Sequence, residues 1–392
     1  MFAAVACTLF VAAEPATRAA ERPSDPEEVV AHVPARESPT QRRIAQLAEA
    51  AANAPNDASR AVALARAHVE ASRADGDPRH LGEAEAVLAR FVRSDAAPEV
   101  RILHATLLQA RHAFPEALRE LDRALAARPG DPQALLTRAT VLTVRGAYRE
   151  ARASCEALRG RVTEAIGVGC HAPIDALQGR YAEARAALDR ALAFTRTQGE
   201  QALLLSLRGE QAYWHGDLTD AEASLKDALA LDPSDRYTRA LYADLLLDAA
   251  RPDEVAPLVR AHLADDALAL RDALAAVALG ADDAPAKVAR LASGFAESRL
   301  RGDAVHQREE ARLWLAQPGA EAAQHALTRA RESWGVQHEP WDARVVLEAA
   351  LRADRPEAAR EVRAWLAETG FEAERLQTFR ARLQMREAEN KP

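Results

Sequence analysis

Three segments of the chain repeat one short pattern: Gly146-Ala-Tyr-Arg-Glu-Ala151, Gly179-Arg-Tyr-Ala-Glu-Ala184 and Gly216-Asp-Leu-Thr-Asp-Ala221. Each segment begins with glycine, which allows the backbone to turn sharply. An acidic residue then precedes a small one, and acidic side chains favour the first turn of a helix because the helix dipole is positive there. The small residue lets a neighbouring helix approach closely. The pattern therefore predicts a tight turn followed by a packed second helix.

The small or apolar residue that closes this pattern recurs along much of the chain. It stands at residues 84, 117, 151, 184, 221 and 255, with separations of 33, 34, 33, 37 and 34 residues. A spacing near 34 residues is typical of a two-helix repeat. Positions four and seven residues later are mostly small or apolar, so they extend the same helical face. We therefore expect stacked antiparallel helix pairs.

The boundaries between these pairs also repeat. Ala54-Pro-Asn-Asp57, Arg128-Pro-Gly-Asp131 and Asp232-Pro-Ser-Asp235 share the order x-Pro-x-Asp. Proline ends a helix at the preceding residue, and aspartate is a good N-cap for the next helix. Two steps of 34 residues beyond Val255 lead to Ala323, so a weaker form of the repeat is expected to continue toward the C-terminus.

Together these features resemble the tetratricopeptide repeat family. On that family's pattern, the later alanine of the second helix falls on Ala124, Ala191 and Ala228, and the terminal proline falls on Pro129 and Pro233. The large aromatic residue usual near the start of the first helix is mostly absent. The resemblance implies an all-α fold, a right-handed superhelical solenoid of antiparallel helix pairs. Residues 41–264 would form tetratricopeptide-like repeats, and residues 265–384 would form divergent ones.

The composition agrees with a helical fold and argues against one class of partner. Only 5% of the 392 residues are aromatic, and alanine, leucine, arginine and glutamate, which favour helices, are abundant. The formal net charge is −8, with basic and acidic residues interleaved. Proteins that bind nucleic acid usually carry a clustered basic excess. No nucleic-acid partner is therefore expected.

The two ends of the chain differ from the repeats in their residue composition. Residues 1–13 form an uncharged apolar run, which is shorter than the roughly 20 residues that a membrane span needs but fits a signal peptide. Residues 14–40 are rich in proline and predict a disordered linker, and residues 385–392 predict a polar tail. These features favour a periplasmic or otherwise exported protein that reaches a membrane only through a partner. Lipid anchoring at Cys7 and a cytoplasmic location are the alternatives.

No catalytic or metal-binding motif stands out in the sequence. It contains no Walker-type glycine loop, G-x-S-x-G, H-E-x-x-H or C-x-x-C. The nearest approach to a metal cluster is Cys170-His171, and adjacent residues of a helix point in different directions. We therefore expect no metal, no cofactor and no catalytic residue.

Two cysteines favour a covalent link between neighbouring repeats. Cys155 falls on the core face of one second helix, and Cys170 falls early in the next first helix. In an oxidising compartment they would form a disulfide, and closing a loop of about 15 residues would stabilise the fold by roughly 3 kcal/mol. The alternative is a pair of buried thiols, because free cysteine often behaves as a small core residue.

The resemblance places the binding surface on the concave groove that the first helices line. In that register, eight residues lie on or near the groove: Gln109, Thr140, Thr143, Glu210, Tyr213, Trp214, Tyr237 and Asp244. Tyrosine and tryptophan are common at binding hot spots. Because neighbours on one helix cannot both face the groove, we expect one of Tyr213 and Trp214 to lie in the core.

The expected function is that of a non-catalytic scaffold or adaptor of the cell envelope, which binds a protein or peptide in the groove. The acidic balance suggests a partner with basic or apolar segments. One alternative is an enzyme with an unrecognised site in the C-terminal region, where His306, Glu309, Glu310 and Trp314 lie close in sequence. A second alternative is a cytoplasmic adaptor. The sequence leaves the oligomeric state open.

Overall fold

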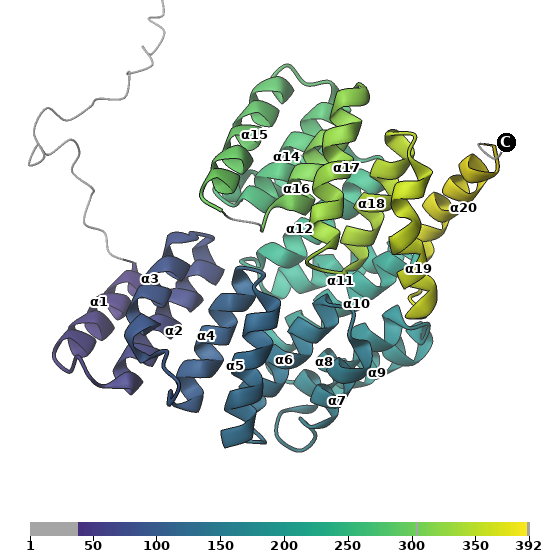
Figure 1. Ribbon diagram of the computed structural model, residues 1–392. Helices are drawn as coiled ribbons and strands as arrows, with labels where there is room; N and C mark the ends of the chain where they lie inside the picture. Colours follow the sequence, from purple (N-terminus) through teal and green to yellow (C-terminus); the bar gives the residue numbers. More distant parts are fainter. Residues whose placement is uncertain (1–37, 303–304, 390–392) are drawn as a thin grey trace, which may run out of the picture.

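The computed structural model of this chain describes residues 38–302 and 305–389, and these residues are mostly helical (Figure 1). They form twenty α-helices and four short 3₁₀ helices, and no strand occurs among them. The predicted signal peptide and nearly all of the predicted linker lie outside the described residues. Within the described part, no helix is both long and apolar enough to cross a membrane.

Most helices form antiparallel pairs, as the repeat pattern predicts. The first helices of the pairs are α2 (Ala58–Asp75), α4 (Pro98–Ala110), α6 (Pro132–Val144), α8 (Glu164–Leu177), α10 (Gln198–His215), α12 (Arg236–Asp248), α14 (Asp266–Leu279), α16 (Gln307–Leu315) and α18 (Pro340–Arg352). The second helices are α3 (Arg79–Leu88), α5 (Phe114–Ala127), α7 (Tyr148–Glu156), α9 (Tyr181–Phe194), α11 (Leu218–Leu231), α13 (Val255–Val259), α15 (Ala284–Leu300), α17 (Ala320–Trp334) and α19 (Arg360–Glu368). Helices α1 (Pro39–Ala52) and α20 (Glu374–Glu389) flank the pairs.

The 3₁₀ helices extend or precede second helices. They are η1 (Ala89–Phe91), η2 (Pro252–Glu254), η3 (Arg260–His262) and η4 (Pro356–Ala359). In the α12–α13 pair, η2 and η3 flank an α-helix of only five residues, Val255–Val259. The second helices α3, α13 and α19 are therefore partly replaced by 3₁₀ turns.

The predicted small residues lie in the seam between the two helices of each pair. The six seam residues are at most 1% exposed: Ala84, Ala117, Ala151, Ala184, Ala221 and Val255. The divergent copies behave alike, because Ala323 is 2% exposed and Ala359 is fully buried. The repeat spacing read from the sequence is thus confirmed, and it extends into the C-terminal region.

The turns inside the pairs share one backbone conformation, with or without glycine. Gly146, Gly179 and Gly216 have φ of +71°, +79° and +93°, in the left-handed region where a side chain is disfavoured. His112 and Ala250 occupy the same place in their own repeats, with φ of +57° and +56°. The geometry of the pair therefore imposes this turn even where the sequence supplies a Cβ atom.

The capping residues act as the x-Pro-x-Asp segments predict, and two boundaries differ from prediction. The carboxylates of Asp57, Asp131 and Asp235 accept hydrogen bonds from backbone amides of α2, α6 and α12. Helix α1 begins at Pro39 because Ser38 and Gln41 form a capping box. Helix α20 runs to Glu389, so the predicted tail of residues 385–392 is helical over its first part. Polarity alone does not end a helix composed of strong helix formers.

The solenoid is wound tightly enough that distant repeats touch. The backbone amide of His338 donates to the carbonyl of Val144 at 2.7 Å, and that of Glu372 donates to the carbonyl of Leu177 at 2.8 Å. At the other end, the guanidinium of Arg236 donates to the carbonyls of Ser72 and Arg73, both at 2.9 Å. The C-terminal helices α18 to α20 therefore lie against the middle repeats (Figure 1).

Candidate partner-binding groove

A cavity of about 940 Å³, here called the groove cavity, lies between the first helices of the middle repeats and the C-terminal segment 366–380. Helix α10 contributes one face to it through Leu203, Leu207, Gln211 and Trp214, which recur at the spacing of helical turns. Helices α6 and α8 add corresponding faces. The concave surface that the repeat register implies is therefore present, and the C-terminal segment covers part of it.

The structure places five of the eight predicted groove residues on the wall of this cavity. They are Thr140, Thr143, Glu210, Trp214 and Tyr237. Both threonine hydroxyls donate to carbonyl oxygens one turn earlier in α6, Thr140 to Leu136 at 3.0 Å and Thr143 to Ala139 at 2.9 Å. Because these hydroxyls are already paired, the two residues have only weak polar capacity left for a ligand.

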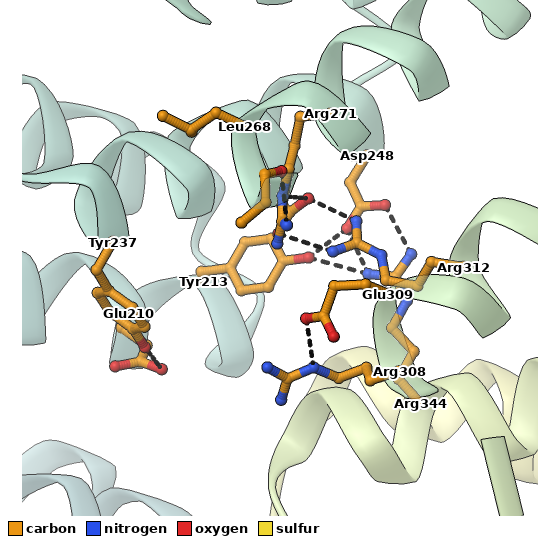
Figure 2. A network of polar contacts seen from close by, with 12 residues as sticks. Glu210, Tyr213, Tyr237, Asp248, Leu268, Arg271, Arg308, Glu309, Arg312 and Arg344 are labelled. Atoms are coloured by element: carbon orange, nitrogen blue, oxygen red, sulfur yellow. Dashed lines mark hydrogen bonds and ion pairs between the residues drawn. The ribbon is translucent and has the colours of Figure 1, made fainter. Parts of the chain in front are cut away.

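One end of the cavity is acidic. The hydroxyl of Tyr237 donates to Glu210 at 2.5 Å, and Figure 2 draws the two side chains together, one from α12 and one from α10. Enclosure by the groove walls raises the pKa of Glu210 to about 7, although the hydrogen bond from Tyr237 opposes the rise. No cation in the described part of the chain forms an ion pair with Glu210. The side chain of Tyr237 is 58% exposed, so the pair is reached from solvent.

Three further wall residues carry buried polar atoms that lack a protein partner. Gln211 is 6% exposed, and Trp214 and Tyr148 are each 3% exposed. In the part of the chain that the structure describes, the Gln211 amide nitrogen and oxygen, the Trp214 indole nitrogen and the Tyr148 hydroxyl have no hydrogen-bond partner. Leaving such a group unpaired costs about 1–3 kcal/mol. All three residues line the groove cavity, but these atoms are themselves buried, so a ligand pairs with them only when the side chains turn toward the cavity.

Sequence reasoning missed Gln211 and Tyr148. Gln211 lies one helical turn after Leu207 and one before His215, so the spacing of the groove face was the available signal. Tyr148 begins a second helix, and second helices are expected to face away from the groove. It reaches the cavity because it lies at the turn, directly after Ala147, where the two helices of the pair meet.

Tyr213 does not line the cavity, which corrects one predicted site residue. It is fully buried, and its hydroxyl donates to Asp248 at 2.5 Å. Its ring packs edge-on against Trp214 and stacks on Trp341 of α18, with centroids 5.1 and 6.1 Å apart. Of the adjacent aromatic residues, Tyr213 thus belongs to the core and Trp214 to the groove wall.

Asp244 is a second correction, because it lies beneath the surface and not in the groove. It is 1% exposed and accepts two hydrogen bonds each from Arg271 of α14 and Arg312 of α16. Burial raises the pKa of Asp244, but the two guanidinium groups outweigh burial and hold it below its ordinary value. Helices α14 and α16 cover this face of α12, which a repeat register alone does not reveal.

Gln109 also lies outside the cavity lining, near the end of α4. Its side chain is half-buried in the repeat that precedes α6. The C-terminal residues Trp365, Glu372 and Glu374 lie close to the turn glycines Gly146, Gly179 and Gly216, which follow α6, α8 and α10. The turn after α4 has no such neighbour among the residues that line the cavity.

The second aspartate of α12 anchors the C-terminal helices. Asp248 accepts hydrogen bonds from Arg344 of α18 at 2.6 and 2.7 Å, and Arg375 of α20 pairs with it as well. Burial would raise the pKa of Asp248, but these arginines hold it at about 2. Figure 2 shows Tyr213, Asp248 and Arg344 converging from separate helices. The groove wall and the covering segment are joined through this cluster.

Cys155 of α7 and Cys170 of α8 form a disulfide in the structure, with Cα atoms 5.7 Å apart. Cys155 is 2% exposed, and Cys170 lies on the groove cavity. The bond joins two consecutive repeats directly behind the groove wall. Of the two alternatives that the sequence leaves open, a disulfide or a pair of buried thiols, the structure has the disulfide.

The C-terminal residues nominated for an enzyme are engaged in ion pairs and ring packing. Glu310 pairs with Arg299 at 2.5 Å, whereas Trp314 stacks on His325 with centroids 5.0 Å apart. Burial raises the pKa of Glu309, but Arg308 outweighs it and brings the pKa to about 2, which suits an ion pair better than proton transfer at neutral pH. His306 packs beside Phe295.

The helix pairs, their seam of small residues and the concave groove are now defined by the described residues. The described residues have the fold of a tetratricopeptide-like solenoid of helix pairs. No family model and no curated protein matches its sequence. Its tetratricopeptide-like character therefore rests on the repeat spacing and on the pairing of its helices.

Several solved structures are similar to it at low sequence identity. The chain matches the APC/C hetero-tetramer Cut9–Hcn1 with 14% identity and a TM-score of 0.42, over 78% of this chain and 52% of that one. It matches the human IFIT1 dimer with m7Gppp-AAAA with 13% identity and a TM-score of 0.48, over 88% and 86% of the two chains. It matches yeast Tom70 with 13% identity and a TM-score of 0.41, over 89% of this chain and 85% of that one. This tetratricopeptide-like chain thus spans about half of its Cut9 match and most of the other two.

Proposed function

We propose that this protein is a non-catalytic scaffold that holds an extended segment of a partner protein in the groove cavity. The observation that carries the proposal is the set of unpaired polar atoms on Gln211 and Trp214, which line a cavity of about 940 Å³. Repeat solenoids commonly use their concave surfaces for binding. A cavity wall with unmet hydrogen-bonding capacity is stabilised when a ligand supplies the missing partners.

The polar groups of the wall match the chemistry of a peptide. The amide of Gln211 presents both a donor and an acceptor, which complement the carbonyl and N–H of a peptide group. The indole of Trp214 offers a donor to a second carbonyl. The lining also includes apolar residues such as Leu207 and Ile166, which suit an aliphatic or aromatic side chain of the partner. An extended backbone with one apolar anchor fits these features together.

The charge of the wall favours a basic residue in that segment. Glu210 lines the cavity without an ion-pair partner in the described residues, and Glu339, Glu372 and Glu374 add further carboxylates, so acidic groups outnumber the two arginines of the lining, Arg73 and Arg380. A lysine or arginine of the partner would supply the counter-charge that Glu210 lacks. Nucleic acid is a poor candidate for the same reason, because carboxylates repel phosphate groups.

We further propose that the protein acts in the cell envelope and meets a membrane only through its partner. The disulfide between Cys155 and Cys170 supports an oxidising compartment, since such bonds are rare in reducing cytosol. The apolar run of residues 1–13 supports export. The cytoplasmic and lipid-anchored alternatives would leave the disulfide without this explanation or require Cys7 to be modified.

Site-specific photo-crosslinking in cells that produce the protein tests the groove assignment. A photoreactive phenylalanine analogue at Thr143 lies on the groove wall, and one at Arg149, whose side chain is 92% exposed on α7, serves as the matched control. The expected result is a discrete crosslinked protein band from position 143 that is absent from position 149. Identical bands from both positions, or none from position 143, would contradict the proposal.

Affinity measurements with the crosslinked segment then test the chemistry. We expect Gln211→Leu to weaken binding at least about tenfold, because the amide's hydrogen bonds to the peptide are lost. Replacing Tyr213 would be uninformative, since it supports Asp248 in the core. A catalytic protein would instead lose turnover on substitution of His306 or Glu310, and binding of a peptide would be unaffected by Gln211→Leu.

A further inference from the structure

A second cluster of functional side chains lies in the first helix pair, outside the groove cavity. His68 projects from α2, and His80 and Glu83 project from α3. The Nδ1 atoms of the two histidines are 3.1 Å apart, and each lies 2.9 Å from the same carboxylate oxygen of Glu83. Three potential ligand atoms therefore form a nearly equilateral triangle.

The local fold explains why these atoms meet. Gly76 adopts φ of +80° and ends α2, so α3 returns antiparallel to α2. His80 and Glu83 are three residues apart and share one face of α3. His68 faces them from α2 and is 7% exposed, whereas the side chain of Glu83 is 52% exposed. The cluster is thus anchored in the core at one corner and open to solvent at another.

Protons alone satisfy this triangle poorly. If both Nδ1 atoms carried hydrogen, two N–H groups aimed at one oxygen would crowd each other across 3.1 Å. If only one did, the lone pairs of the other nitrogen and of the carboxylate oxygen would still face each other at 2.9 Å, and if neither did, three lone pairs would face one another. A cation bonded to all three atoms removes the conflict. With metal–nitrogen and metal–oxygen bonds of about 2.0–2.1 Å in tetrahedral geometry, ligand atoms lie roughly 3.3 Å apart, a few tenths of an ångström from the observed spacing.

We propose that His68, His80 and Glu83 bind a divalent transition-metal ion, with Zn²⁺ as the best fit. Two imidazole nitrogens and one carboxylate oxygen suit zinc, and also copper or nickel, whereas Mg²⁺ and Ca²⁺ prefer oxygen ligands. The exposed side of Glu83 leaves room for water as a fourth ligand. The ion would bridge α2 and α3 and fasten the first pair of the solenoid.

The sequence contains no recognisable signal for this site, and the prediction from the sequence is that no metal binds. The ligands are spaced as H-x₁₁-H-x₂-E, which is not a recognised motif. Only the i, i+3 pair on α3 is local, and the third ligand depends on how α2 packs against it. The proposed metal site does not depend on the groove cavity or on the function proposed for it.

The test uses the full chain without a polyhistidine tag, stripped of metal with a chelator and titrated with Zn²⁺ in a calorimeter. We expect one equivalent of Zn²⁺ to bind, and Co²⁺ to give the visible absorption bands of a tetrahedral site. Glu83→Gln and His80→Ala should each weaken Zn²⁺ binding by at least about 100-fold, because even outer-shell changes cost 10–100-fold. Mg²⁺ should give no heat at the same concentrations.

His325→Ala is the matched control, since His325 lies on α17 beside Glu321 with its side chain 52% exposed. It should leave the Zn²⁺ affinity unchanged. Glu83→Gln keeps the test interpretable should His80→Ala unfold the pair, because the Glu83 side chain is largely exposed. Absence of Zn²⁺ binding, an affinity loss below tenfold in Glu83→Gln, or an equal loss in His325→Ala would each overturn the proposal.

Discussion

Single residues at the turns determine how closely the C-terminal segment can approach the repeats. Gly146 combines φ of +71° with close packing, because a Cβ atom there would overlap the ring of Trp365. Gly160 has nearly the same φ, +72°, but a Cβ atom there would meet nothing within 4 Å. Glycine is therefore required at position 146 both by the positive φ and by the close ring of Trp365, whereas at position 160 only the positive φ requires it.

This pair of glycines gives the first prediction. Gly160→Ala should cost about 1–2 kcal/mol of unfolding free energy, which is the penalty of a left-handed alanine. Gly146→Ala should cost clearly more, because Trp365 must move as well. Chemical denaturation of both variants measures the difference. Equal losses of unfolding free energy in the two variants would mean that the Trp365 side chain moves aside at no cost. The C-terminal helices would then not be held in place at this turn.

Glu210 gives a pH-dependent prediction at the same scale. Its folded pKa of about 7 lies above the ordinary value of 4.5, so the folded state binds more protons than the unfolded state between these two values. Stability from this group is present at low pH and is lost as pH rises from about 4.5 through 7. Glu210→Gln should therefore raise the melting temperature relative to wild type at pH 8 and change it little at pH 4.5. A variant that is equally affected at both pH values would rule out the shift.

At the scale of elements, α12 is the point where the middle repeats and the C-terminal helices are joined. Its two aspartates, Asp244 and Asp248, meet arginines from α14, α16, α18 and α20. Arg312 and Arg344 also lie over the ring of Trp341, at 4.1 and 4.7 Å from its centroid. Charge and aromatic packing therefore combine at a single junction.

Removing one carboxylate from this junction should be strongly destabilising. Asp248→Ala leaves Arg344 and Arg375 without their counter-charge, and breaking a buried ion pair in this way costs about 3–5 kcal/mol. The folded pKa of Asp248 of about 2 is lower than its ordinary 3.8, so the stability it confers is present above pH 4 and lost as pH falls toward 2. Urea unfolding at pH 7 and pH 3 measures both effects. An Asp248→Ala variant as stable as wild type at pH 7 would show that the cluster is not needed to hold the C-terminal helices.

The disulfide acts between elements as well, because it ties α7 to α8. Thiol counting on the denatured, unreduced protein should find neither Cys155 nor Cys170 free, and reduction should lower stability by about 3 kcal/mol for a loop of this length. Chain that retains residues 1–13 would show one thiol, from Cys7. Two free thiols at positions 155 and 170 in protein purified without reductant would contradict the bonded state.

At the scale of the whole molecule, the core is divided unevenly. One hydrophobic cluster runs from Ala139 to Leu383 and unites the middle repeats with the C-terminal helices. A separate, smaller cluster from Val62 to Leu107 serves the first repeats. In repeat proteins each unit is stabilised mainly by its neighbours, so a terminal unit with its own small core is the weaker part.

Hydrogen exchange should follow this division. Amides of α2 and α3 should exchange earlier than those of α10, α12 and α18, because the larger core must open for the latter to unfold. Exchange measured by mass spectrometry on peptic peptides resolves these helices. Equal protection in α3 and α12 would contradict a difference in stability between these two of the five hydrophobic clusters of the described residues and favour a single cooperative unit.

The repeat itself was readable from sequence because its causes are local. A small seam residue such as Ala184, a turn glycine such as Gly179 and a cap such as Asp131 act over a few residues of chain. Their spacing therefore predicted the helix pairs, and the family resemblance added the expectation that Glu210 and either Tyr213 or Trp214 face the groove. The positive φ at His112 and Ala250 was not readable, because the pairing of helices imposes it on residues that do not prefer it.

The sequence by itself determined that the chain forms helical pairs with one face turned inward. Tertiary structure alone decided what that face meets: Asp244 and Tyr213 are covered by C-terminal helices, and His68 meets His80 and Glu83 across a turn. The physical reason is that the curvature of a solenoid adds up small rotations between many pairs. The contacts of Asp244 and Tyr213 with the C-terminal helices depend on that sum, which no single repeat encodes, whereas the His68 cluster depends on how the two helices of one pair pack.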